Sequence, residues 1–351
     1  MANSLHIVDA DAHVLESAAT WSYLSGKETA FEPVAVKAPK KSGGEEEFWL
    51  LDGLLLPKSQ NMGTDTLRES RELTDIGARL RHMDELGVDI QVIYPTVFLR
   101  PFTRRAEVEA ALYRSYNRWM GEVWRQGKGR LRWVVLLPLL SMDSALEELR
   151  RARENGACGV FMRGLEADRH LCDHYFFPLY EAAQNLDLAV CVHSGSGSFA
   201  MHDYYSGETS FPRFKLLNVT AFHTLLFNAI PDMFPRLRFG FIESGAQWLP
   251  YAIRDLLRRI ERQRGNPKGT AKKNFLADNR FFVTCQTDDD LEYILTYTGE
   301  DSLVIGTDYG HSDVSAEIDA LKKLPQLPGV SASVADKILS ANARRLYGLG
   351  D

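Results

Sequence analysis

Short apolar runs rich in Val, Ile, Leu and Phe recur along the whole chain and alternate with segments whose apolar residues repeat at helical spacing. Continuous apolar runs are typical of strands buried on both faces, and the spaced pattern is typical of the helices that cover them. The runs predict eight strands, at about residues 5–8 leading into 9–13, 89–94, 131–137, 159–163, 188–193, 237–243, 280–284 and 302–307.

The segments between these runs predict helices at about 75–87, 105–126, 144–155, 176–186, 213–230, 247–263, 288–298, 315–323 and 333–346. Alternation of eight strands with helices predicts an α/β fold, and specifically a parallel (β/α)8 TIM barrel. A doubly wound open sheet is the competing topology. However, neither GxGxxG nor GxxxxGK[ST] follows any predicted strand, which removes the best reason to prefer it.

The alternation is interrupted between about residues 17 and 70, where prolines, glycines and a charged run occur. The apolar segments 48–51 and 54–56 flank Asp52 and Gly53, a pattern compatible with a small hairpin. We therefore predict that residues 1–351 form a single domain, with a small insertion after the first strand at about 17–70.

The composition, with 45% hydrophobic and 25% charged residues, is ordinary for a soluble globular protein. A net charge of -6 argues against a nucleic-acid or anionic-membrane surface, which needs clustered Lys and Arg. The sequence has no membrane-length apolar stretch, no secretory signal pattern and no CxxC among its 4 cysteines. We therefore expect a cytoplasmic protein that binds a small molecule, with no nucleic acid or membrane partner.

Side chains able to bind a metal stand at the ends of several predicted strands. Asp11 and His13 are two residues apart, so both side chains point the same way from the first strand. His193 ends the fifth strand, and Asp308 follows the eighth. Barrel closure brings the eighth strand beside the first, and the carboxyl ends of all strands meet at one mouth. We expect metal contact from these four residues, with His193 and Asp308 also candidates for catalysis.

Two glutamates leave several roles open. Glu243, at the end of the sixth strand, is a candidate for a general acid or base, a ligand for a second ion, or a residue that fixes His193. Glu16 lies just beyond His13, where it suits a metal ligand, a substrate contact or a helix start equally well.

Three further residues are predicted substrate contacts. Arg163 ends the fourth strand, where its guanidinium would bind a carboxylate or phenolate if it points into the mouth; a surface salt bridge is the alternative. Tyr309 and His311 follow Asp308 directly and are included in the same set.

Several short motifs, in this order and spacing, resemble those of one family. They are Asp9–Glu16, Arg81–Asp89, Val192–Gly195, Phe234–Phe239, Gly306–Tyr309 and Asn342–Gly348. Over nearly the whole chain the sequence resembles the amidohydrolase-related family of metal-dependent (β/α)8 barrels. This family includes aminocarboxymuconate-semialdehyde decarboxylase and resorcylate-type decarboxylases.

The resemblance implies that Asp11, His13, His193 and Asp308 hold one divalent ion. Zinc is expected, with manganese or iron also suited to the oxygen ligands. Family members often carry a catalytic His at the end of strand six, for which Glu243 is the natural substitute here. The wider superfamily places a carbamate-forming Lys on strand four in its two-metal members, and this chain lacks it, so a single ion is expected. Self-association is common in the family, which implies a homodimer.

The leading hypothesis is a metal-dependent hydrolase that acts on a small, carboxylated or cyclic organic substrate through a metal-activated water. Asp308 would take the proton of the water, Glu243 or Asp308 would deliver it to the leaving group, and Arg163 would anchor the acid. The alternative is a non-oxidative decarboxylase or hydratase, in which an acid group protonates carbon. A third possibility is a barrel that binds ligands or partners without catalysis.

Overall fold

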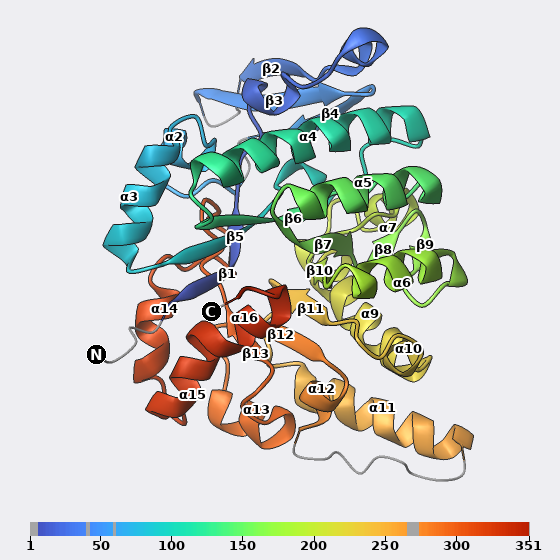
Figure 1. Cartoon of the computed structure of the whole chain (residues 1–351), viewed down its shortest axis with the longest axis vertical. Helices are drawn as coiled ribbons and strands as arrows, with labels where there is room; N and C mark the ends of the chain where they lie inside the picture. Colours follow the sequence, from blue (N-terminus) through green and yellow to red (C-terminus); the bar gives the residue numbers. More distant parts are fainter. Residues whose placement is uncertain (1–5, 40–42, 59–60, 265–273, 351) are drawn as a thin grey trace.

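The computed structural model describes residues 6–39, 43–58, 61–264 and 274–350. Its centre is an eight-stranded sheet that curls into a barrel, with every strand paired parallel to its neighbour in chain order (Figure 1). The strands are β1 (Val8–His13), β5 (Ile90–Tyr94), β6 (Leu131–Val135), β7 (Ala157–Arg163), β10 (Ala189–His193), β11 (Phe239–Ile242), β12 (Phe281–Cys285) and β13 (Leu303–Ile305). The predicted TIM barrel is confirmed.

The barrel is closed by the segment that follows β13. The amide of Asp308 donates to the carbonyl of Asp11 at 2.9 Å, and the amide of His13 donates to the carbonyl of Tyr309 at 3.0 Å. A parallel bridge between Ala12 and Tyr309 lies at the same place. The segments that carry the predicted metal ligands at the two ends of the chain are therefore hydrogen-bonded directly to each other.

This closure depends on a glycine. A Cβ atom on Gly306 would lie 2.3 Å from the Cβ atom of Asp11 and 2.7 Å from its backbone nitrogen. We expect Gly306→Ala to force the two strands apart and to lower the free energy of unfolding by about 2–4 kcal/mol. Thermal and urea unfolding would measure the loss. Gly350→Ala is the control, because an added methyl there meets nothing within 4 Å. A Gly306→Ala protein with wild-type stability would contradict this account.

Helices alternate with the strands and cover the outside of the barrel (Figure 1). Those of eight or more residues are α3 (Ile76–Leu86), α4 (Ala106–Gln126), α5 (Met142–Glu154), α6 (Phe177–Asn185), α9 (Lys215–Phe227), α11 (Leu249–Arg264) and α13 (Leu291–Thr298). Local sequence fixes their ends. In α3, the Asp75 carboxylate accepts from the amide of Ala78 at 2.9 Å, and Gly87 ends the helix in the left-handed region at φ 72°.

Shorter helical segments complete the chain. They are α1 (Ala18–Trp21), η1 (Gly26–Phe31), α2 (Arg68–Arg71), η2 (Val97–Leu99), η3 (His174–Phe176), α7 (Phe199–Tyr204), α8 (Ser210–Arg213), α10 (Ile230–Met233), α12 (Phe275–Asp278), α14 (Ala320–Lys323), η4 (Leu324–Gln326), α15 (Ala332–Asp336), the π-helical η5 (Lys337–Ala341) and α16 (Asn342–Tyr347). The helix predicted at 315–323 is present only in its last part, as α14. The helix predicted at 213–230 ends at Phe227, where Ala229 turns into the left-handed region before Pro231.

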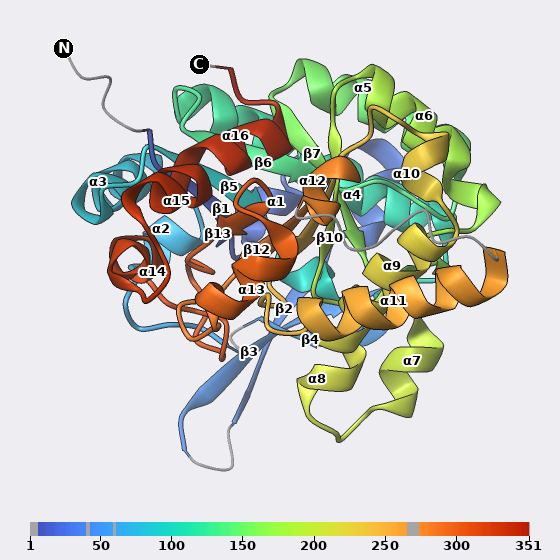
Figure 2. The ribbon, with the colours of Figure 1, turned by 90° about the horizontal axis from the view of Figure 1, so that it is seen from below.

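The insertion after β1 contains a three-stranded antiparallel sheet made of β2 (Val34–Pro39), β3 (Glu45–Leu51) and β4 (Leu54–Pro57). The predicted hairpin corresponds to β3 and β4, which pair Leu51 with Leu54. A second small hairpin joins β8 (Leu165–Glu166) to β9 (Arg169–His170). Figure 2 shows β3, β4, α7 and α8 projecting from one side of the barrel. Among the described residues, no helix has both the length and the apolar character needed to cross a bilayer.

The last helix, α16, lies against the opposite end of the barrel, near the N-terminal ends of the strands (Figure 2). The Asn342 side-chain amide donates to the carbonyls of Leu303 and Glu300 at 2.7 and 2.9 Å. The Tyr347 hydroxyl donates to the carbonyl of Ala10 at 2.6 Å. The end of the barrel at the N-terminal ends of the strands is therefore covered by α16. The predicted site lies at the opposite end, beneath the insertion.

Candidate metal centre

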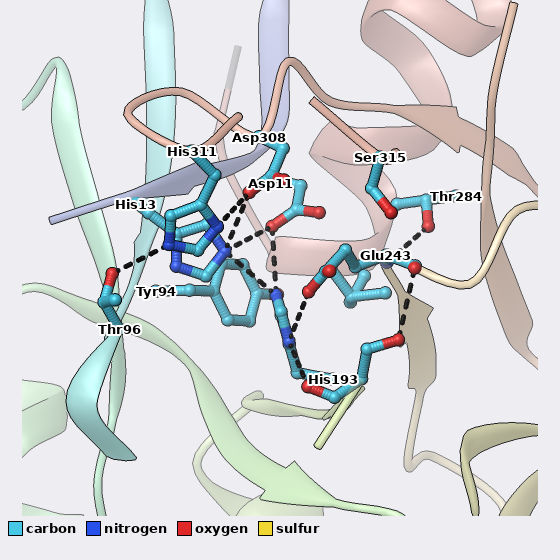
Figure 3. A network of polar contacts seen from close by, with 12 residues as sticks. Asp11, His13, Tyr94, Thr96, His193, Glu243, Thr284, Asp308, His311 and Ser315 are labelled. Carbon is cyan, nitrogen blue, oxygen red and sulfur yellow. Dashed lines mark hydrogen bonds and ion pairs between the residues drawn. The ribbon is translucent and has the colours of Figure 1, made fainter. Parts of the chain in front are cut away.

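Four side chains point toward one another at the carboxyl ends of β1, β10 and β13 (Figure 3). The Nε2 atoms of His13 and His193 are 3.1 Å apart. Oδ1 of Asp11 lies 3.5 Å from the first and 3.3 Å from the second. Oδ1 of Asp308 is 3.4 Å from Nε2 of His13. All four predicted ligands are buried. Their ligand atoms belong to two sets, each within 4.8 Å, that share His13: the first also contains Asp11 and His193, and the second also contains Asp308 and His311.

These spacings suit a small cation. Ligand atoms at about 2.1 Å from a tetrahedral ion lie about 3.4 Å from one another. The observed separations of 3.1–3.5 Å are close to that value. Asp11, His13 and His193 therefore stand at the distances that a common first coordination sphere requires, and Asp308 stands at such a distance from His13.

The imidazole tautomers also fit a metal. Nδ1 of His13 lies 3.0 Å from the carbonyl of Pro95, and Nδ1 of His193 lies 3.0 Å from the carbonyl of Ser194. A carbonyl only accepts, so both Nδ1 atoms carry the proton, and in the neutral rings both Nε2 lone pairs face the centre. Backbone acceptors of this kind orient metal-binding histidines.

Hydrogen bonds alone do not satisfy this group. Within the described part of the chain, both carboxylate oxygens of Asp308 and Nδ1 of His311 are buried without a hydrogen-bond partner. A proton on Nε2 of His193 could form a hydrogen bond with Asp11 or with His13. The carboxylate of Asp308 would still have no hydrogen-bond partner. Two carboxylates with two neutral imidazoles form a neutral set with a divalent ion. The residues present thus fit the single ion that was expected.

Burial and neighbouring charges shift these groups in different directions. Burial lowers the pKa of His13 to about 3, so this ring is neutral. For His193, burial opposes the charged form, but Glu243 and Asp11 outweigh it and raise the pKa. For Asp11, burial acts against ionisation, yet His193 and His13 hold the pKa well below its usual range. Burial, with the charge of Asp11, raises the pKa of Asp308 well above its ordinary value.

Glu243 follows β11 and lies beside the ligand set. Its Oε2 is 3.2 Å from Nδ1 of His193. Its backbone adopts the left-handed conformation, φ 64°, which is unusual for a glutamate. Two contacts hold it there: its amide donates to the Thr284 hydroxyl at 2.8 Å, and the Ser194 hydroxyl donates to its carbonyl at 3.1 Å. Burial raises the pKa of Glu243 well above its ordinary value.

His311 also reaches the site. Its ring stacks on His13 with centroids 4.0 Å apart, and its Nδ1 is 2.7 Å from Oδ1 of Asp308. The Thr96 hydroxyl donates to the carbonyl of Val14, so it accepts from Nε2 of His311 at 3.0 Å. Burial lowers the pKa of this imidazole. His311 therefore presents a second nitrogen lone pair beside the ligand Asp308.

Asp9 is placed behind the site rather than in it. The register of β1 against β5 shifts between Asp9 and Ala12, so the simple two-residue alternation from Asp9 to Asp11 does not hold. The Asp9 carboxylate accepts from the amide and hydroxyl of Thr307, at 2.9 and 2.6 Å, and from the Gln91 amide at 3.0 Å. Burial raises its pKa to about 6. It ties β1 to the segment that carries Asp308.

Two predicted substrate contacts are engaged elsewhere. The Glu16 carboxylate accepts from the amides of Thr96 and Val97 at 3.1 and 3.0 Å, so it braces the loop after β5, and burial raises its pKa to about 7. The Tyr309 hydroxyl lies 2.7 Å from Nδ1 of His82 on α3, and the guanidinium of Arg79 covers its ring at 3.5 Å. Both side chains take structural positions beside the centre.

Arg163, expected to anchor a substrate acid, is paired inside the protein. It donates through Nη2 and Nε to the two oxygens of Glu166, at 2.6 and 2.9 Å. Its Nη1 donates to the carbonyls of Phe98 and Arg100 at 3.1 and 3.0 Å. The guanidinium is buried and bidentate, and a partner three residues away satisfies it. Nothing in this arrangement aims Arg163 at the pocket.

A buried glutamate beside this pair gives stability a pH dependence. Burial, with a smaller contribution from Glu166, raises the pKa of Glu109 to about 8, against an ordinary value of 4.5. Between these values the folded state holds a proton that the unfolded chain releases, so this contribution to stability falls as the pH rises toward 8.

Glu109→Gln imitates the protonated form and can still accept from the amide of Leu140, which lies 2.8 Å from Oε2. We expect it to stabilise the protein at pH 9 by on the order of 1 kcal/mol or more relative to its effect at pH 5. Melting curves across this range would measure the difference. The exposed Glu147→Gln is the matched control, and an equal effect of Glu109→Gln at both pH values would refute the assignment.

A pocket of about 770 Å³, including its open mouth, leads from the surface to this centre. Thr96, Glu243 and His311 lie on its inner side. The rest of its wall comes from the insertion, from the loop after β5, from α8 and α9, and from the segment after His311: Leu56, Pro57, Asn61, Val97, Leu99, Arg100, Ser210, Phe214, Lys215, Asp313, Val314 and Ser315.

Sequence reasoning missed three residues that shape the site. Thr96 orients His311, Glu166 occupies Arg163, and the Tyr94 ring packs beneath His193 with centroids 4.9 Å apart. Tyr94 and Thr96 flank Pro95, which ends a predicted strand, so their place at the mouth could have been noticed. Glu166 carried no such signal, because it lies in a short hairpin.

Comparisons with known proteins agree with this fold. The amidohydrolase family model matches residues 8–349. A search of curated protein sequences finds no match. Among solved structures, an amidohydrolase from Mycobacterium avium subsp. paratuberculosis is 18% identical, with a TM-score of 0.77 and 99% of each chain covered.

Two decarboxylases share the architecture at similar distance. The 5-carboxyvanillate decarboxylase from Sphingomonas paucimobilis is 17% identical, with a TM-score of 0.68 and coverage of 99% of this chain and 100% of that one. A dihydroxybenzoic acid decarboxylase from Polaromonas sp., solved with manganese and 2-nitroresorcinol, is 19% identical, with a TM-score of 0.67 and coverage of 98% and 97%. At these identities the likeness concerns the fold, whereas the family match spans nearly the whole sequence. The chain belongs to the amidohydrolase family.

Proposed function

We propose that the protein is a metal-dependent lyase that removes carbon dioxide, without oxidation, from a small aromatic or unsaturated carboxylic acid. One observation carries the proposal: a carboxyl group, that of Glu243, stands in the pocket beside the ligand His193, with Oε2 at 3.2 Å from Nδ1. Decarboxylation needs one proton at the carbon that loses its carboxylate, and Glu243 is placed to hold it. The two decarboxylases that share the fold support this choice.

Asp11, His13, His193 and Asp308 would hold the ion, which when bound would supply positive charge that attracts substrate oxygens. Zinc suits the mixture of imidazole and carboxylate donors, and the manganese in the Polaromonas structure supports manganese as the other candidate. Metal analysis of the purified protein distinguishes these ions, and both should be tried when the metal is added back.

In the proposed reaction the bond between the ring or alkene carbon and the carboxylate breaks, and its electron pair stays on that carbon. The proton of Glu243 adds there, so the substrate carboxylate and one proton give carbon dioxide and the shortened product. The Glu243 carboxylate that remains is stabilised by the Nδ1–H of His193 and regains a proton from solvent through the pocket. His311 keeps its predicted place as a substrate contact, because its ring lines the same pocket.

A hydrolase is the second candidate, and one observation favours it. Asp308 stands among the ligands with neither carboxylate oxygen hydrogen-bonded to any described residue, where it could take a proton from an attacking water. In such a reaction the oxygen of solvent enters the organic product, which gives a clear distinction from decarboxylation.

Product analysis tests the choice. Protein loaded with manganese or zinc would be incubated with hydroxybenzoic acids and with amides and lactones, in deuterated and in oxygen-18 water. We expect carbon dioxide release, one deuterium at the vacated carbon and no oxygen-18 in the organic product. Oxygen-18 uptake by an amide or lactone, with no acid decarboxylated, would establish the hydrolase instead. Uptake of water by an alkene without carbon dioxide would indicate a hydratase.

A further inference from the structure

The pocket wall away from the metal ligands is basic. Arg100, in the loop after β5, and Lys215, the first residue of α9, both line the pocket. Arg213 belongs to α8, directly before this point in the chain, and packs against the same ring as Arg100: their guanidinium carbons are 5.7 and 5.8 Å from the ring centre of Phe214. Cations from two separate segments of the chain therefore gather around one aromatic side chain.

These cations act on one another. Burial and then the charge of Arg213 lower the pKa of Arg100. Burial and then the charges of Arg213 and Arg100 lower the pKa of His202 on α7. Within the described residues, Nε of Arg213 and Nε2 of His202 are buried without a hydrogen-bond partner. A cluster of like charges at a pocket wall raises the local positive potential and favours an anionic ligand.

The acidic residues of the pocket lie beside the proposed metal ligands. Glu243 and Asp313 each place a carboxylate oxygen within 4.8 Å of one of Asp308, which makes them neighbours of the metal ligands. Among the described residues, Lys215 makes no hydrogen bond or ion pair through its ammonium group. The pocket thus contains a carboxylate cluster and cationic side chains, and the charge of Lys215 reaches Asp308, whose pKa it acts to lower against the effect of burial.

We propose that Lys215 and Arg100 form an anion subsite that binds a second carboxylate of the substrate, remote from the one held at the metal centre. The inference rests on the proposed function, which it deepens: the substrate is a diacid that spans the pocket. Arg163 cannot supply this anchor, because Glu166 and two backbone carbonyls occupy its donors. Lys215 provides the point charge that contacts the carboxylate, and Arg100, held against Phe214, adds to the positive potential of this wall.

A matched pair of acids tests the subsite. 2-Hydroxybenzoate carries one carboxylate, and 4-hydroxyisophthalate is the same molecule with a second carboxylate on the ring. Binding of each to manganese-loaded protein would be measured by titration calorimetry. We expect the diacid to bind at least about tenfold more tightly than the monoacid, as a charge-assisted contact warrants. Lys215→Met should weaken binding of the diacid far more than binding of the monoacid and so remove most of this advantage, and Lys215→Arg should retain it.

Three outcomes would overturn the inference: equal affinity for the two acids, a diacid advantage that survives Lys215→Met, or a Lys215→Met protein that loses both acids equally. The proposed function is scored separately, by carbon dioxide release from the acid panel. Carbon dioxide release without a diacid preference rejects the subsite alone. A diacid preference that depends on Lys215, without carbon dioxide release from any acid, rejects the decarboxylase alone.

Discussion

Replacing Asp308 by asparagine should reduce the bound divalent metal from about one ion per chain to a small fraction, and turnover should disappear with it. Asparagine keeps the size of the side chain but removes one of the two negative charges that balance the ion. Beside Asp11 and two neutral imidazoles, about one unit of positive charge would stay unbalanced in a buried site, which is costly.

The size of this effect can be bounded. Structural zinc sites with four ligands bind with roughly 10–16 kcal/mol, so loss of one anionic ligand should weaken binding at least about a hundredfold. Metal content by mass spectrometry measures the stoichiometry. Melting temperature with added manganese or zinc measures the affinity independently, because an ion at 100 times its Kd stabilises a protein by about 2.7 kcal/mol. The wild type should show this rise and the variant should not.

Asp255→Asn is the matched control. Asp255 lies on α11 and pairs with His223 and Arg259 at the protein surface, away from the metal ligands. Its loss should leave metal content and turnover as they are. If Asp308→Asn bound metal as tightly as the wild type, Asp308 would not be a ligand, and the four-residue centre would be wrong.

Glu243→Gln should lower turnover by about 10²–10⁴, the range expected for removal of a general acid, and should leave the metal content unchanged. Glutamine fills the same space and keeps an oxygen that can accept from Nδ1 of His193, but it has no acidic proton to give. The measurements are carbon dioxide release per bound ion and deuterium incorporation at the product carbon.

The exposed Glu208→Gln, which removes the same charge on the loop between α7 and α8, is the control and should match the wild type. A Glu243→Gln protein that turns over normally would exclude Glu243 as the acid. A parallel loss of metal and turnover would make it a ligand instead, one of the roles that its position at the end of the sixth strand left open.

The barrel could be predicted from the sequence because its strands have a distinctive composition. Strands buried on both faces must be apolar at every position, and β7, β10 and β12 carry this pattern in a form that no surface strand shares. Residues at the carboxyl ends of such strands share one mouth by topology alone. This is why the sequence alone could predict that Asp11, His193 and Asp308 lie at the same end of the barrel.

Side-chain partners were beyond this reasoning. Its position at the end of a strand places the backbone of Arg163 near the barrel mouth. The position of its guanidinium is set by the ion pair with Glu166, which lies on a hairpin of two-residue strands. Tyr309 follows a ligand in sequence, yet the barrel seam turns its ring toward Arg79 and His82. In both cases the deciding contact comes from a segment with no strong periodic pattern.

The insertion shows the same limit. Its hairpin was recognisable from two apolar runs around a turn, but β2 is mostly exposed and pairs with β3 through backbone bonds that leave little trace in composition. The short helices α7 and α8 were likewise hidden within a longer irregular stretch. Of these elements, β4 and α8 line the pocket, so part of its wall comes from the segments least open to prediction.

The seam between β1 and the segment after β13 has a consequence for biosynthesis. Asp11 and His13 leave the ribosome long before the amide of Asp308, which bonds to the carbonyl of Asp11. At translation speeds of 5–20 residues per second, roughly 15–60 s separate the two. A nascent chain with half of its donors has little power to select one metal over another. The proposed centre therefore cannot select its metal until the segment after β13 has been synthesised and has joined β1.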